Sequence, residues 1–221
     1  MLRLMICLVF LSVSAMAAEP APSIPENSKS FATSQQTMPK LYHQASRKVA
    51  GGTLVIGIVL PDYKEENLYQ SPQALLYIAL QHHDGTVSEV AKTDQFDYRG
   101  YGGKTSVETI EITSETKFSI QFNTHGGCAG GYTVYSFALI RNKWRVAGQD
   151  INHFSCGTWE NGLESMDYYI YKWSANFLTG LIVEREYQGD KLLSSKRSRK
   201  VFPAFPIEQF VPFDEKYKPR L

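Results

Sequence analysis

The chain of 221 residues has little cysteine, little net charge and no long apolar run beyond its N-terminus. Its three cysteines are too few for a disulfide-rich scaffold, and none lies in the CxxC spacing of zinc or redox motifs. With 23 basic and 22 acidic residues, the net charge of +1 gives no long-range field that favours nucleic acid or an anionic membrane. The sequence therefore predicts neither a nucleic-acid partner nor a membrane span.

The N-terminal apolar run predicts export. Arg3 precedes the run Leu4–Val13, and the small-residue sequence Ala15-Met16-Ala17 follows, which is the arrangement of a secretory signal peptide. A membrane anchor is the alternative, but a bilayer-spanning helix needs about 20 apolar residues and this run is shorter. We expect a signal peptide at residues 1–18 and a periplasmic or extracellular mature protein.

Loss of the signal peptide removes Cys7 and leaves Cys128 and Cys156. In an exported protein two cysteines most simply form a disulfide. The alternatives are a thiol nucleophile or a zinc site completed by His125 and His153, which each lie three residues before a cysteine. A nucleophile needs a lowered pKa and an orienting group, and the sequence shows neither. We expect the disulfide, no metal and no other cofactor.

Hydrophobic periodicity predicts an all-β domain over residues 51–200. The segment Lys117–Gln149 contains three strand-like runs separated by two turns, the pattern of an antiparallel meander. Ala74–Gln81 has the length of a short helix, but Asp84-Gly85 and a second alternating run follow it, as in a β-hairpin. About ten short strands joined by tight turns predict a sandwich, an open barrel or propeller-like sheets.

Two segments flank this domain. Residues 19–50 are rich in Pro, Ser and Gln and predict a loose leader, whose last part, Leu41–Val49, forms either a short helix or an extended arm. Residues 201–221 combine four prolines with four phenylalanines. A disordered tail seldom carries that many aromatic residues, so we expect this C-terminal segment to lie along the domain surface.

Several segments occur in an order that is familiar from other exported proteins. They are ALLYIALQHHDGTVSEVAKTD, TKFSIQFNTHGG, NKWRVAGQD and SANFLTG. This succession resembles a loose group of exported bacterial proteins with FG-GAP-like or VCBS-like strand repeats, mostly of uncharacterised function. The resemblance implies an all-β fold and export, and no catalytic groups. The chain lacks the DxDxDG loop by which FG-GAP repeats hold calcium, so we expect no calcium site.

Aromatic, glycine and histidine residues gather in three loops, at Thr93–Lys104, His125–Tyr132 and Asn152–Ser165. Tyrosine, tryptophan and glycine at loop tips suit contact with a protein or a glycan. The predicted partner-binding residues are Tyr98, Arg99, Tyr101, His125, Tyr132, His153 and Trp159. His82-His83-Asp84 is not expected to bind metal, because neighbouring residues of a strand point to opposite faces.

Three functions follow from these features. The first is a non-enzymatic exported β-domain that binds a protein or glycan of the cell envelope, with an inhibitor or immunity-type protein as one version. The second is a hydrolase or metal-dependent enzyme that uses His125 and His153. The third is a structural or assembly protein.

Overall fold

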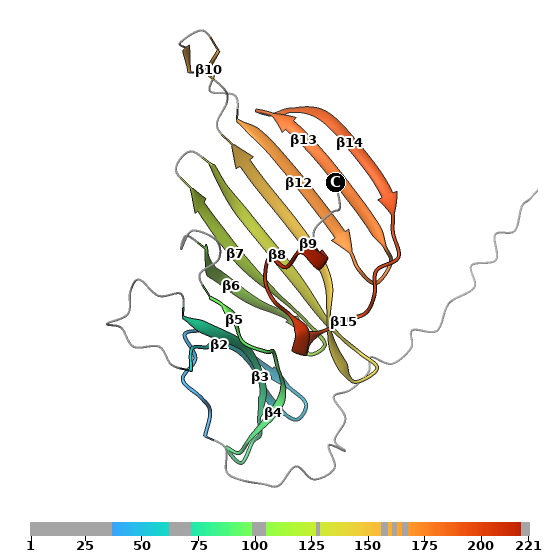
Figure 1. Cartoon of the computed structure of the whole chain (residues 1–221). Coiled ribbons are helices and arrows are strands. Elements are labelled where there is room, and N and C mark those ends of the chain that lie inside the picture. The colour runs from blue at the N-terminus through green and yellow to red at the C-terminus, as the bar shows by residue number, and fades with distance from the viewer. Residues whose placement is uncertain are drawn as a thin grey trace, which may run out of the picture.

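The computed structural model describes residues 37–61, 72–98, 105–126, 129–155, 159–160, 163–164 and 168–217. Antiparallel strands form one sheet of five strands and one of eight (Figure 1). The eight-stranded sheet does not close, since its strand order begins at β14 and ends at β6. The all-β prediction is confirmed, and the two open sheets form a sandwich.

The small sheet has the order β1-β2-β3-β4, with β5 paired to the start of β3. Its central strands read as nearly continuous apolar runs because β2 and β3 are buried along most of their length. Asp84-Gly85 turns the chain between β3 and β4, as predicted: Gly85 has a φ of 84° and Asp84 accepts a hydrogen bond from the Thr86 amide. The strands are β1 (His43–Val49), β2 (Gly52–Val59), β3 (Gln73–Gln81), β4 (Val87–Lys92) and β5 (Phe96–Asp97).

The large sheet is an antiparallel meander. Strands that follow one another in the chain, from β6 to β9 and from β12 to β14, are hydrogen-bonded neighbours, and β9 pairs with β12. Arg141 and Asn142 join β8 to β9 in a two-residue turn with φ values of 51° and 61°, the geometry that matches the twist of paired strands. Its strands are β6 (Thr105–Ser114), β7 (Lys117–Gly126), β8 (Ala129–Ile140), β9 (Lys143–Ser155), β12 (Tyr169–Asn176), β13 (Leu181–Gln188) and β14 (Lys191–Arg199). A two-stranded ribbon of β10 (Trp159–Glu160) and β11 (Leu163–Glu164) lies between β9 and β12 in sequence.

The large sheet has an inner and an outer face. We call inner the face that carries Tyr135, Phe137 and Trp173, which share one core with Leu54 and Ile56 of the small sheet. We call outer the opposite face. Because side chains alternate along a strand, residues one position away from these core residues point outward. The burial pattern of β8 and β12 follows this alternation.

The C-terminal segment crosses the inner face of the large sheet, where Figure 1 shows it in red in front of β8 and β9. It contains β15 (Phe205–Pro206), paired with β9, and the 3-10 turns η2 (Ile207–Gln209) and η3 (Glu215–Tyr217). Phe210 and Tyr217 have no exposed surface, and the Phe210 ring centre lies 5.0 Å from that of Tyr135. The segment is therefore part of the core, and not only a cover on the surface.

The other flanking segment also reaches into the fold. The part of residues 19–50 that could have been a helix or an arm is strand β1, which pairs with β2. Arg47 fixes β1 to the edge of the large sheet by donating hydrogen bonds of 2.9 and 2.8 Å to the carbonyls of Ile112 and Thr113. The predicted signal peptide lies outside the described residues. In the part of the chain that the structure describes, no helix is long and apolar enough to cross a membrane.

Candidate functional site

The strand register brings the borders of the three predicted loops to one end of the large sheet. Thr105, which follows the first loop, pairs with Thr124, and the β7–β8 connection lies between Gly126 and Ala129. At the same end, β9 extends to Ser155, which pairs with Tyr169, so the first residues of the predicted third loop belong to a strand. The first loop therefore ends beside the other two, although it begins at the small sheet.

Three of the predicted binding residues have described side chains, Tyr98, Tyr132 and His153, and these three do not share one surface. Tyr98 follows β5 at the small sheet, and its ring centre lies 6.2 Å from that of His43. Tyr132 is 39% exposed on the outer face of β8, whereas His153 is exposed on the inner face of β9. His125 and Trp159 are placed only as members of β7 and β10. Arg99 and Tyr101 lie outside the described residues.

The two cysteines also lie outside the described residues, but the strands that precede and follow them are described. The pairing of β8 with β9 reaches Gly130 opposite Phe154. In the sequence, Cys128 and Cys156 each lie two positions beyond this pair. The register of the described strands is thus compatible with the disulfide, which stays a prediction.

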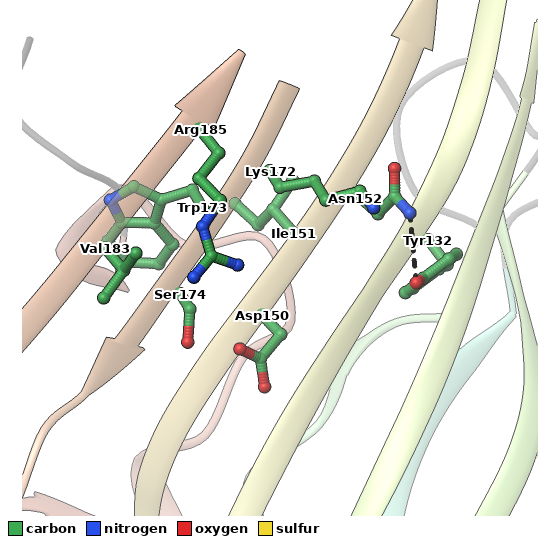
Figure 2. A pocket seen from close by; sticks show the side chains of 9 residues that line it. All are labelled: Tyr132, Asp150, Ile151, Asn152, Lys172, Trp173, Ser174, Val183 and Arg185. Carbon is green, nitrogen blue, oxygen red and sulfur yellow. Dashed lines mark hydrogen bonds between the residues drawn. The ribbon is translucent and has the colours of Figure 1, made fainter. Parts of the chain in front are cut away.

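A hollow of about 380 Å³ opens on the outer face of the large sheet, across β8, β9, β12 and β13 (Figure 2). We call it the outer hollow. Its lining combines an aromatic ring, an amide, a hydroxyl, a carboxylate and two cationic side chains. Seven lining residues belong to the outer face: Tyr132, Asp150, Asn152, Lys172, Ser174, Val183 and Arg185. The other two, Ile151 and Trp173, lie between them on β9 and β12 and belong to the inner face.

The register explains why these polar side chains meet. Tyr132 pairs with Asn152, Asn152 with Lys172, and Lys172 with Arg185, so one residue from each of four strands stands in a single row. Asp150 and Ser174 pair in the next row on the same face. Since alternate residues share a face, both rows point outward and Figure 2 shows them from that side.

Two contacts orient the row. The side-chain amide of Asn152 donates a hydrogen bond of 3.0 Å to the hydroxyl of Tyr132. The Lys172 ammonium lies 5.1 Å from the centre of the Tyr187 ring, a cation–π distance. Tyr132 and Lys172 are therefore held by neighbours while they stay accessible to a ligand.

The charged groups of the outer hollow are not neutralised by any residue that the structure describes. None of Asp150, Lys172 and Arg185 forms an ion pair with another described residue, and all three are exposed. Figure 2 shows the Arg185 guanidinium directed toward the side of the hollow that holds Ser174 and Asp150. A ligand in the outer hollow would therefore meet two cationic hydrogen-bond donors, Lys172 and Arg185, and one carboxylate acceptor, Asp150.

The described residues contain no group of three or more His, Cys, Asp or Glu that could hold a metal ion. Tyr171, between Ile170 and Lys172, is a titratable residue on the opposite face. Burial raises the pKa of its hydroxyl, and the carboxylates of Glu184 and Glu186 raise it further. Tyr171 is thus held in its neutral form and points away from the outer hollow.

Most residues of the outer hollow were not predicted from the sequence, because the predicted binding residues were sought in loops. Asp150, Asn152, Lys172 and Arg185 lie within strands, and only Tyr132 was predicted to bind a partner. Alternation does place Lys172 and Ser174 on one face of their strand. It does not reveal that β9 pairs with β12 across a long connection, and that pairing creates the row.

Comparison with known proteins adds no role for these residues. The resemblance to proteins with FG-GAP-like or VCBS-like repeats stays a prediction. No protein-family model, no curated protein and no solved structure matches this chain.

Proposed function

We propose that this protein is an exported, non-enzymatic binding domain that recognises a component of the cell envelope with the outer face of its large sheet. The observation that carries the proposal is the outer hollow, in which four strands present exposed polar and aromatic side chains side by side. The envelope as the location follows from the predicted signal peptide.

The scaffold suits binding because the site is built on strands. Side chains on a hydrogen-bonded sheet lose less conformational freedom on binding than side chains on loops, so less of the interaction energy is spent on ordering them. The hydrogen bond from Asn152 to Tyr132 restricts the tyrosine ring further. An exposed aromatic side chain with polar neighbours is typical of recognition surfaces.

The geometry favours binding over hydrolysis. A glycoside hydrolase of the usual kind needs two carboxyl groups that flank the bond, and Asp150 is the only carboxylate among the described residues that line the outer hollow. Of the two histidines expected to act in an enzyme, His153 stands on the inner face, and the side chain of His125 lies outside the described part of the structure. The inhibitor or immunity-type version remains a hypothesis about the loops at the end of the same sheet.

The test compares two exposed tyrosines on opposite faces. Tyr132 is 39% exposed on the outer face and Tyr169 is 44% exposed on the inner face. Labelled mature protein is titrated onto isolated cell envelopes, and Tyr132→Ala is expected to weaken binding about tenfold, as loss of a central aromatic contact does. Tyr169→Ala is expected to bind like the wild type. Equal effects of both substitutions, or none of either, would contradict the proposal.

A further inference from the structure

The near-zero net charge conceals a separation of charge between the two faces of β12, β13 and β14. The register places Lys172 opposite Arg185, Val183 opposite Arg197, and Leu181 opposite Arg199. These positions share the outer face, whereas Glu184 and Glu186 occupy the inner face of β13. The outer face of these three strands therefore carries four exposed cations, Lys172, Arg185, Arg197 and Arg199, and no carboxylate.

This arrangement is unfavourable for the folded protein alone. Like charges directly opposite each other on an antiparallel pair destabilise it, and Lys172 faces Arg185 in this way. On the inner face of the neighbouring pair, Glu184 faces Lys196, which is the favourable combination. No described residue forms an ion pair with Arg185, Arg197 or Arg199. A local conflict of this kind is expected where a surface serves binding.

We infer that the ligand of the outer face is an anionic polysaccharide, an inference that rests on the proposed function. Guanidinium groups donate paired hydrogen bonds to carboxylate, sulfate or phosphate groups, which supplies the charge complementarity. The row that begins at Tyr132 on β8 ends at Ser195 on β14, two residues before Arg197 on the same face. It crosses five neighbouring strands, or about 19 Å at the usual strand spacing. That length fits a segment of a polymer better than a single small anion.

The mixture of groups favours a sugar polymer over a nucleic acid. Asp150 and the Asn152–Tyr132 pair adjoin the cations, and a carboxylate accepts hydrogen bonds from sugar hydroxyls. The net charge of +1 also gives no general attraction for nucleic acid, so only a local surface is basic.

The strand β14 provides a matched pair of substitutions. Arg197 and Lys196 are adjacent, exposed and of equal charge, but they point to the outer and the inner face respectively. Mature protein is titrated calorimetrically with polygalacturonate, with dextran sulfate, with neutral dextran and with single-stranded DNA. We expect an anionic polysaccharide to bind in preference to neutral dextran and DNA, and binding to weaken as salt is raised. Arg197→Gln and Arg185→Gln should each weaken it about tenfold, and Lys196→Gln should leave it unchanged.

The outcomes separate this inference from the proposed function. The inference of an anionic ligand is wrong if neither anionic polysaccharide binds better than neutral dextran. It is also wrong if Lys196→Gln lowers the affinity as much as Arg197→Gln does. If Tyr132→Ala weakens binding to isolated envelopes but Arg197→Gln does not, the outer face binds a ligand of another class. If neither substitution affects envelope binding, both the inference and the proposed function are wrong. Preference for single-stranded DNA would likewise overturn the inference.

Discussion

At the scale of single residues, Lys172 and Arg185 show most directly how binding and stability conflict. Both are exposed, they face each other across β12 and β13, and Lys172 is also in contact with the ring of Tyr187. A pair of like charges is tolerated here because the fold has other sources of stability, above all the shared core beneath the sheet. A residue kept for folding alone would not be expected at this position.

The first prediction is that Arg185→Gln stabilises the protein. Removing one charge relieves repulsion across the strand pair, which amounts to about 0.2–1 kcal/mol in the free energy of unfolding. Urea denaturation measures it, with Lys196→Gln as the control, because that change removes a favourable partner of Glu184 and should lower stability slightly. A loss of stability in Arg185→Gln would show that the residue serves the fold.

A second residue, His43, makes stability depend on pH. Burial lowers the pKa of its imidazole below the ordinary value of 6.5, and the Glu108 carboxylate opposes this in part. The unfolded chain therefore takes up this proton at a higher pH than the folded protein does. Stability should fall as the pH is lowered from above 6.5 through the folded pKa.

Thermal unfolding at mildly alkaline and mildly acidic pH tests this prediction. The melting temperature of His43→Gln should fall less between the two conditions than that of the wild type, since the variant has no imidazole to protonate. An equal fall in both proteins would mean that other groups account for the whole pH dependence.

At the scale of elements, one buried hydroxyl helps to fix the C-terminal segment to the large sheet. Tyr135 on β8 accepts hydrogen bonds of 2.7 Å from the Phe213 amide and 3.0 Å from the Gln149 side chain. Burial raises the pKa of Tyr135 far above its ordinary value, so the hydroxyl stays neutral at every physiological pH. The segment is thus fixed to the large sheet by a specific contact as well as by its aromatic rings.

Tyr135→Phe should lower the free energy of unfolding by about 1–3 kcal/mol, because two buried donors lose their acceptor. The matched control is Tyr132→Phe, which removes a partly exposed hydroxyl that accepts one bond from Asn152. The control should change stability by less than about 0.5 kcal/mol. Denaturant unfolding followed by tryptophan fluorescence gives both values, and equal losses would argue against the anchoring role of Tyr135.

The elements also show what the sequence could and could not predict. Alternation and the Asp84-Gly85 turn correctly favoured a strand over a helix at Gln73–Gln81. Strand β1 was ambiguous because its residues are all exposed or only partly buried, so its sequence has a weak period. The C-terminal segment has no period at all, since its aromatic residues enter the core from turns and 3-10 helices.

At the scale of the whole molecule, long-range pairing decides both the fold and the site. The sequence predicted the strands of the large sheet but not the contact of β9 with β12, which brings Asn152 beside Lys172. It predicted balanced charge but not the division of that charge between two faces. Which residues share a row depends on register, and no local pattern in the sequence specifies register between distant strands.

The same register bears on the predicted disulfide. Because the cysteines each lie two positions beyond the Gly130–Phe154 pair, we expect the exported protein to have no free thiol and a mass lower by two hydrogen atoms than the reduced chain. Closing a loop of 29 residues stabilises the folded state by about 3.5 kcal/mol, so Cys128→Ser with Cys156→Ser should lose a similar amount. Intact mass with thiol labelling decides the matter, and two free thiols in the exported protein would contradict the prediction.

The most direct test of the account is to see which face of the large sheet meets the ligand. Side-chain nuclear magnetic resonance signals of labelled mature protein can be followed during titration with an anionic polysaccharide. If the outer face binds the polysaccharide, the signals of the Asn152 amide and of the Arg185 and Arg197 guanidinium groups shift, while those of Gln188 and His153 on the inner face stay unchanged. Shifts confined to the inner face, or none at saturating polysaccharide, would contradict it.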